Sequence, residues 1–186
     1  DFHEAVRLSD KLAVMRDGSF VQSGTPHDIV LNPADSYVAT FSRELDRTRI
    51  LRASDISIQR VPVMHRAETL RTVQEALRRS GKSYAVIADQ QGKPEGFLRG
   101  ETMMVYPGSP EHPVSSLIVE PIISVAGSDP LIEIYARAAQ GAPLAIVGAD
   151  GMISGAVDAA DIVDHLDKIN CDQPGMPAAA DLGMQS

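Results

Sequence analysis

Cysteine, tryptophan and long apolar runs are scarce or absent in this sequence. It has one cysteine and no tryptophan in 186 residues, and aromatic residues make up 4% of it. A single thiol cannot form an internal disulfide, and zinc sites built from several cysteines are excluded. No stretch approaches the roughly 18 apolar residues that cross a bilayer, and no secretory leader is visible. We therefore expect a soluble, cytoplasmic protein with a core of Val, Ile, Leu, Ala and Met.

Motifs for common catalytic chemistry are missing as well. The sequence contains no Gly-x-x-x-x-Gly-Lys-Ser/Thr loop to hold phosphates, and no acidic residue follows an apolar strand where it would hold magnesium. Its five histidines form no His-x-x-x-His pair, so no metal site is expected. Cys171 has no basic neighbour that would activate its thiol. We predict no catalytic residue within these 186 residues.

The formal net charge of −8 is distributed unevenly. Residues 56–108 carry 8 basic and 5 acidic groups, a balance of +3, whereas residues 109–168 carry 2 basic and 9 acidic groups, a balance of −7. Such asymmetry can mark an electrostatic partner, or it can reflect helices that are solvated differently. The basic groups have no interleaved aromatics and no recognition motif, so no nucleic-acid partner is expected.

The first 45 residues predict a hairpin followed by helices. Asp17 and Gly18 separate two short apolar runs, which is a strong hairpin signal. Thr25 can cap a helix whose first position is Pro26. A further helix is expected from about residue 34 to residue 45. Residues 46–58 are polar and basic and are expected to form a connector.

Residues 57–168 contain an internal repeat. Residues 70–73 match 131–134 at an offset of 61, residues 81–87 match 141–147 at 60, and residues 96–98 match 155–157 at 59. Each copy predicts a β-α-β-β-α unit with an apolar strand, at 84–88 or 144–147, that is buried on both faces. One unit of about 60 residues would be marginal alone. We therefore expect the two units to pack together.

These patterns predict a mixed α/β (α+β) chain with five parts. They are residues 1–45, the connector 46–58, a first copy at 59–108, a second copy at 109–168, and a tail at 169–186. The tail contains Pro174, Gly175, Pro177 and an Ala run, without periodicity. We expect it to be flexible.

The repeat resembles a tandem CBS pair, also called a Bateman module. Copies in that family often end with Gly, two apolar residues, Thr or Ser, two variable residues and Asp. Residues 155–161 (Gly-Ala-Val-Asp-Ala-Ala-Asp) keep the final Asp161 but have Asp158 at the Thr/Ser position. Residues 96–102 have Arg99 and Thr102 at these two positions. The resemblance implies one recognisable ligand site and one degenerate site.

That resemblance also implies a cleft between the copies, with an adenine nucleotide as its candidate ligand. The candidate cleft residues are Asp161, Asp158, Ile123 and Ala145, and the degenerate site has Thr102 and Arg99. Asp161 would accept hydrogen bonds from ribose hydroxyls, although Asp158 would repel a phosphate. The alternative is that both aspartates only cap and charge the start of a helix.

Residues 1–45 resemble the end of an ABC ATPase domain. Residues 1–5 are similar to the stretch that follows the family's switch histidine. Residues 10–18 (Asp-Lys-Leu-Ala-Val-Met-Arg-Asp-Gly) are similar to its Asp-Arg-Ile-Ala-Val-Met-x-x-Gly element, and residues 22–26 to a further importer element. Asn-Pro-Ala at 32–34 with Tyr37, Val38 and Phe41, followed by a CBS pair, resembles the glycine betaine/proline/choline uptake subfamily. On this match the switch histidine, phosphate loop and signature would precede Asp1 in a longer parent.

These resemblances imply the regulatory C-terminal portion of an ATP-binding subunit, in an ABC importer for glycine betaine/proline/choline-type osmoprotectants. The CBS pair would sense ionic strength or an adenine nucleotide. The parent would be a transport ATPase using ATP and Mg, peripheral on the inner face of the bacterial plasma membrane and bound to a transmembrane permease subunit. A homodimer through the CBS modules is expected. The alternative is a ligand-sensing or dimerising CBS module that binds an adenosyl nucleotide or cyclic dinucleotide without a direct role in transport.

Basic residues gather on and around the first helix of the first copy. They are Arg71, Arg78, Arg79 and Lys82. We expect them to form a regulatory basic face that meets an anionic membrane surface or the acidic second copy. The alternative is a solvated helix with partners such as Glu75.

Overall fold

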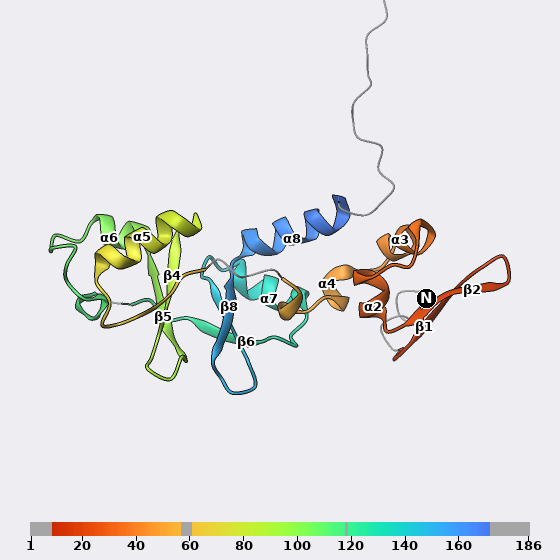
Figure 1. Cartoon of the computed structure of the whole chain (residues 1–186), viewed down its shortest axis with the longest axis horizontal. Helices are drawn as coiled ribbons and strands as arrows, with labels where there is room; N and C mark the ends of the chain where they lie inside the picture. The colour runs from red at the N-terminus through yellow and green to blue at the C-terminus, as the bar shows by residue number, and fades with distance from the viewer. Residues whose placement is uncertain (1–8, 57–60, 118, 172–186) are drawn as a thin grey trace, which may run out of the picture. The chain divides into compact units, whose positions relative to one another are not determined.

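A computed structural model of the chain describes residues 9–56, 61–117 and 119–171, with only the backbone at 170 and 171. It divides into two compact units (Figure 1). One is Arg52–Val163, and the other contains the residues up to Leu51 together with those from Asp164 onward. Residues 1–8 and most of the tail, for which a switch-histidine neighbour and flexibility were predicted, lie outside the described residues.

The predicted hairpin is confirmed in the unit that contains the early residues. Strands β1 (Leu12–Arg16) and β2 (Ser19–Gly24) pair antiparallel, with Arg16 opposite Ser19. Asp17 and Gly18 form the two-residue turn, and both have positive φ, 52° and 79°. That conformation matches the right-handed twist of the strands and explains why Asp-Gly occurs here.

Three helices follow this hairpin: α2 (Pro26–Leu31), α3 (Ser36–Arg43) and α4 (Arg47–Ile50). The predicted cap is present, because the Thr25 hydroxyl accepts from the Asp28 amide and the Asp28 carboxylate accepts from the Thr25 amide. Helix α3 begins later than predicted, since Asp35 rather than a residue at 34 caps it by accepting from the Val38 amide.

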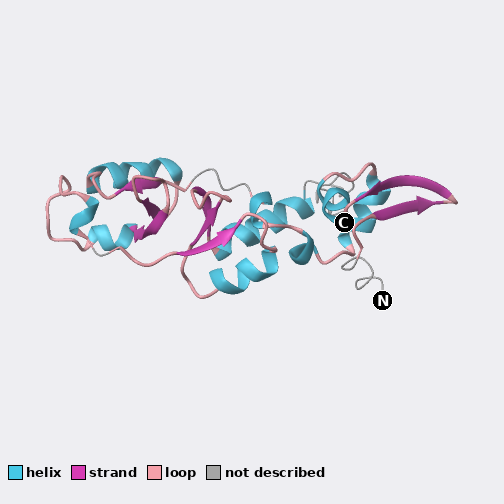
Figure 2. Cartoon of the chain, turned by 90° about the horizontal axis from the view of Figure 1, so that it is seen from below, coloured by secondary structure: helices cyan, strands magenta, loops and turns pink. Residues whose placement is uncertain are grey.

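Both predicted β-α-β-β-α units are present within Arg52–Val163 and the following helical residues. The first copy comprises β3 (Val63–His65), α5 (Leu70–Ser80), β4 (Tyr84–Ala88), β5 (Pro94–Arg99) and α6 (Gly100–Met104). The second comprises β6 (Ile123–Ala126), α7 (Leu131–Ala138), β7 (Leu144–Val147), β8 (Ile153–Val157) and α8 (Ala159–Cys171). In each three-stranded sheet the middle strand pairs parallel with the first and antiparallel with the third (Figures 1 and 2).

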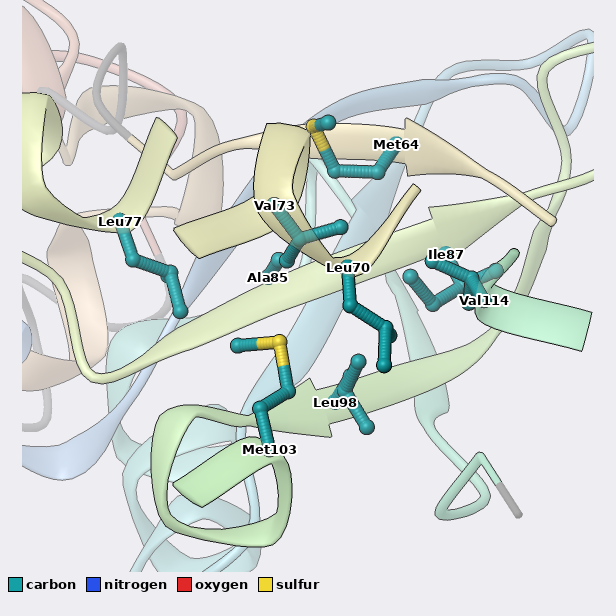
Figure 3. Packing of buried hydrophobic residues seen from close by; sticks show 9 residues of the cluster. All are labelled: Met64, Leu70, Val73, Leu77, Ala85, Ile87, Leu98, Met103 and Val114. Atoms are coloured by element: carbon teal, nitrogen blue, oxygen red, sulfur yellow. The ribbon is translucent and has the colours of Figure 1, made fainter. Parts of the chain in front are cut away.

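The first copy is held together by one side of α5. Leu70, Val73 and Leu77 recur at helical spacing and are buried. They face Ala85 and Ile87 of the central strand, as Figure 3 shows. The central strand is buried along its whole length, as continuous apolar strands covered on both faces should be.

The strand registers correct the predicted spacing of the repeat. Met64 pairs with Ile87 in the first copy, and Val125 pairs with Ile146 in the second. A β-bulge follows Ile87 and also follows Ile146. The central strands are therefore related by an offset of 59 rather than 60. The two missing residues therefore both fall before the central strand, where the first helix has 8 residues in the second copy and 11 in the first.

Each copy is preceded by a short lead segment that docks on the other copy. The segment of η1 (Ala53–Asp55) binds the second copy, because the amides of Ala53 and Ser54 donate to the carbonyls of Asp129 and Gly127, both at 2.9 Å. The segment of η2 (Val114–Ser116) binds the first copy in the same way. There Val114 N donates to Glu68 O at 2.8 Å, and Ser115 N donates to Arg66 O at 3.0 Å.

The four residues of one pair of contacts correspond to the four residues of the other at an offset of 61. An approximate twofold axis between the two copies requires this correspondence. The polar connector predicted at 46–58 thus contains ordered structure, namely α4 and η1. Leu51 and Ala53 within it are fully buried. The boundary between the two compact units lies after Leu51, within the predicted connector.

Candidate ligand cleft between the two copies

The two copies meet through a small apolar core of their own. Tyr84, Val86 and Phe97 of the first copy pack with Ala156 of the second, and all are buried. The Tyr84 and Phe97 rings meet edge to face, with centroids 6.5 Å apart and planes at 82°. This arrangement is favourable for aromatic pairs. The copies therefore have a packed interface, and the polar groups around it are held in place.

A backbone bridge closes one edge of this interface. Phe97 N donates to Glu120 O at 2.8 Å, and Glu120 N donates to Phe97 O at 3.0 Å. Arg99 also pairs with the Glu120 carboxylate at 3.3 Å. A side chain at Gly96 would collide with the bridge, since its Cβ would lie 2.4 Å from Glu120 O. The glycine of the repeat motif is thus required by the close approach of the two copies.

The candidate aspartates form a reciprocal cap at the start of α8. Asp161 N donates to Asp158 Oδ1 at 2.9 Å, and Asp158 N donates to Asp161 Oδ2 at 3.2 Å. The predicted helix-capping role is therefore confirmed for both aspartates, because each carboxylate accepts from an amide at the start of the helix. It leaves the other oxygen of each carboxylate to be satisfied elsewhere.

Lys82 of the first copy supplies the partner of Asp161. Its ammonium group donates to Asp161 Oδ1, the oxygen that does not cap the helix. The side chains of Lys82 and Asp161 are only 22% and 18% exposed. Lys82 follows Gly81, the left-handed residue that ends α5 with a φ of 70°. The pair joins the first copy to the second across the cleft.

The hydroxyl of Tyr84 lies beside the same carboxylates. Tyr84 is 2% exposed, and its hydroxyl has no hydrogen-bond partner of normal geometry among the described residues. Burial, and then the charges of Asp158 and Asp161, raise the pKa of Tyr84 well above its usual value. The phenol therefore stays neutral at physiological pH and keeps its proton as a hydrogen-bond donor.

The equivalent positions of the degenerate site make a different contact. Gly141 stands at the position equivalent to Lys82 by the offset of 59, and its carbonyl accepts from Arg99 Nη2 at 2.8 Å. Arg99 is in turn equivalent to Asp158. At the degenerate site an arginine therefore donates to a carbonyl, whereas at the Asp161 site a lysine donates to a carboxylate. Thr102, equivalent to Asp161, is half-buried in α6.

The two remaining candidate residues, Ile123 and Ala145, differ in their exposure to solvent. Ile123 is 46% exposed on β6, so its side chain can contact a ligand. Ala145 is 0% exposed in the centre of β7 and presents no surface in this conformation. The structure thus brings together Asp158, Asp161, Lys82 and the Tyr84 hydroxyl as the polar groups of the cleft. Tyr84 and the cleft position of Lys82 were not predicted.

The predicted basic face has fewer free charges than expected. Arg71 pairs with Glu111, and both side chains are more than half exposed. Arg79 Nε donates to the Glu75 carbonyl. Lys82 turns into the cleft and does not share the exposed face. Arg78 lines a hollow of about 490 Å³ together with Lys82, Gln74, Leu77, Gly81, Gly100, Met103 and Met104.

Two further features were looked for within the described residues. No group of three or more His, Cys, Asp or Glu side chains there is placed to hold a metal ion. No helix in that part of the chain is both long enough and apolar enough to cross a membrane.

Curated proteins similar to this chain are transport ATP-binding subunits. The glycine betaine/proline betaine transport system ATP-binding protein ProV of Salmonella typhimurium is 29% identical over 153 residues, 78% of this chain and 37% of that protein. The glycine betaine/carnitine transport ATP-binding protein GbuA of Listeria monocytogenes is 32% identical over 98 residues, 53% and 25% of the two chains. The choline transport ATP-binding protein OpuBA of Bacillus subtilis is 27% identical over 176 residues, 88% and 45%.

The chain thus spans less than half the length of each of these homologues. No protein-family model matches it. Among solved structures, a CBS-pair protein from Arabidopsis thaliana aligns with a TM-score of 0.55 and 15% identity, covering 66% of this chain and 98% of that one. The CBS domains of a transcriptional regulator from Streptococcus pneumoniae align with a TM-score of 0.54 and 14% identity, covering 62% and 98%. The predicted fold, a tandem CBS pair, is confirmed.

Proposed function

We propose that this chain is the regulatory C-terminal portion of the ATP-binding subunit of an ABC importer for glycine betaine, proline or choline-type osmoprotectants. Its homologues are ATP-binding subunits of such transport systems, and its larger unit has the CBS-pair fold. In this proposal the parent hydrolyses ATP with Mg and docks on a transmembrane permease at the inner face of the plasma membrane. The part described here regulates that activity, and two chains associate through their CBS modules.

The signal that the pair senses is, in this proposal, a ligand of the cleft at Asp161. The observation that supports it is the cluster of Asp161, Lys82 and the Tyr84 hydroxyl, in which a buried donor has no partner of normal geometry among the described residues. Buried polar groups normally have a partner, and each exception needs a reason. An adenine nucleotide would supply ribose hydroxyls for Asp161. The Tyr84 hydroxyl is buried and presents no surface in this conformation, so a ligand would meet it only if the site opened.

Ionic strength is a second candidate signal, supported by a different surface. Met104 and Val105 are 84% and 81% exposed, and Arg78 lies in the hollow that Met104 lines. An exposed apolar pair next to basic groups suits an anionic membrane surface, where each basic group contributes about 1 kcal/mol. Salt weakens such contacts because the Debye length falls from about 10 Å at 0.1 M to about 3 Å at 1 M. Arg71, Arg78 and Arg79 are the residues of this proposed contact.

Calorimetric titration of the chain separates these signals. ATP, AMP and cyclic di-AMP are each titrated at low and high salt. Saturable binding of one of them, lost in Asp161→Ala, supports nucleotide sensing. Binding of none would refute it.

The salt signal is tested separately in the full-length importer, reconstituted in vesicles containing anionic lipid. Neutralising Arg71, Arg78 and Arg79 is expected to shift the salt threshold of transport. An unmoved threshold would refute the membrane contact.

A further inference from the structure

We propose that Lys82 is an internal competitor for the ligand of the cleft, so that a nucleoside phosphate enters only by exchanging partners with the Lys82–Asp161 pair. On binding, Asp161 would pass from the ammonium group to the ribose hydroxyls, and Lys82 would pass from the carboxylate to the phosphate. This inference rests on the proposed nucleotide function and adds to it a role for Lys82.

The first step is that each oxygen of the Asp161 carboxylate already accepts a hydrogen bond within the protein. Oδ2 accepts from the Asp158 amide and Oδ1 accepts from Lys82. The capping contact is part of α8 and is needed to satisfy its first turn. The contact with Lys82 comes from 79 residues away and belongs to no helix or strand. An oxygen can accept two donors, but the Asp161 side chain is only 18% exposed. We therefore expect a ribose hydroxyl to reach Oδ1 by taking the place of Lys82.

The second step is that Lys82 cannot simply be released. Its side chain is 22% exposed, so most of it lies away from water. Removing one partner of a buried ion pair is costly because the other charge is left without compensation. A ligand with hydroxyls alone would displace the ammonium group and give it nothing in return. A ligand that also carries an anion satisfies both groups, and this selects nucleotides over nucleosides.

The third step is that the structure provides room and a second cation for such an anion. The hollow beside Lys82 has a volume of about 490 Å³, within the range of small-molecule sites. Arg78 and the apolar residues Leu77 and Met103 line it. Lys82 can therefore turn from Asp161 toward the hollow and meet a phosphate next to Arg78. Asp158 stays in its helix cap and does not line the hollow.

The pair is also placed where salt has little effect on it. Exposed pairs such as Arg71–Glu111 are readily screened, but pairs that are mostly buried are screened much less. A change in ionic strength alone would leave the Lys82–Asp161 contact largely intact. This separates the exchange at Lys82 from the salt-dependent membrane contact at Arg71 and Arg79, whereas Arg78 has a part in both proposals.

The test compares AMP with adenosine in calorimetric titrations of the 186-residue chain. Wild type is expected to bind AMP about tenfold or more tightly than adenosine, because only AMP pairs the displaced lysine. Lys82→Gln is expected to bind adenosine more tightly than wild type does, since the competitor is gone, and AMP less tightly. Lys93→Gln, at an exposed lysine of the same copy, is the matched control and should behave as wild type. Circular dichroism establishes that each variant is folded.

The outcomes separate the possible roles of Lys82. Opposite changes in the two affinities support the exchange. A loss of AMP binding with adenosine unchanged would make Lys82 a phosphate contact only, and a parallel loss of both would make it structural; either result overturns the exchange and leaves nucleotide sensing in place. If neither compound binds wild type or any variant, the exchange fails, and the nucleotide function fails with it only if ATP and cyclic di-AMP do not bind either.

Discussion

Replacing Gly96 by alanine should uncouple the two CBS copies. The new Cβ would lie 2.4 Å from the Glu120 carbonyl oxygen and 2.5 Å from Val119 Cγ1. Nonbonded contacts of a Cβ atom are essentially never this short, so the segment at Val119 and Glu120 must move away. Its two hydrogen bonds with Phe97, at 2.8 and 3.0 Å, would then be lost or lengthened.

The expected cost can be worked out from these contacts. Each lost hydrogen bond costs about 1 kcal/mol, and forcing an extra carbon into a packed site costs about 1–3 kcal/mol. We expect Gly96→Ala to lower the free energy of unfolding by about 3 kcal/mol in urea titrations followed by circular dichroism, and separate transitions for the two copies would show uncoupling directly.

The matched control for this change is Gly100→Ala. A Cβ at Gly100 would lie 3.4 Å from Ser83 O and 3.6 Å from Leu77 Cδ1, both ordinary contacts. Alanine also favours the helical conformation at this first position of α6. Its stability should match or exceed that of wild type. If Gly96→Ala were within about 0.5 kcal/mol of wild type, the size of an ordinary surface substitution, the coupling assigned to the Phe97–Glu120 bridge would be wrong.

Three further changes test other parts of the structure. Tyr84→Phe should leave stability within about 0.5 kcal/mol of wild type or raise it, because a hydroxyl without a normal partner among the described residues contributes little; a loss above about 1 kcal/mol in urea unfolding would indicate a bond to Asp161. Leu131→Ala, at a fully buried position of α7, should cost about 2–5 kcal/mol in the same assay, and a smaller loss would mean that the site collapses readily. Thr25 lowers the pKa of Asp28 by hydrogen bonding, so the resulting stability is present at neutral pH and lost as the pH falls through the folded-state pKa. Thr25→Ala should raise that pKa in a carboxyl NMR titration, and an unchanged value would contradict the capping role.

The repeated fold was predictable because each copy carries its pattern in consecutive residues. The central strands at 84–88 and 144–147 were predicted with the bounds that the structure has. The hairpin followed from Asp17 and Gly18, whose positive φ values are a local requirement of the turn. These features depend on spacing and local conformation, and both can be read along the sequence.

The parts that were missed depend on contacts between distant residues. Helix α4 and η1 are four and three residues long, too short for an apolar period, and Leu51 and Ala53 are buried only by tertiary packing. The cleft position of Lys82 was missed for a related reason. The acidic second copy was one of two predicted partners of the basic residues, and Lys82 makes such a contact. Its partner Asp161 could not be identified because it is 79 residues away. The spacing error of one residue in the central strands arose because the sequence does not show that α7 is shorter than α5.

Each lead segment packs on the other copy, and this determines which fragments of the chain could fold by themselves. A piece containing only residues 59–108 would lack Val114, a fully buried member of its own core. A piece that begins at residue 109 would lack Ala53 and Ser54, which bind the loop before α7. Neither half is autonomous, although each has a complete β-α-β-β-α order. A fragment intended to keep the fold should therefore contain both copies together with the stretch from Arg52.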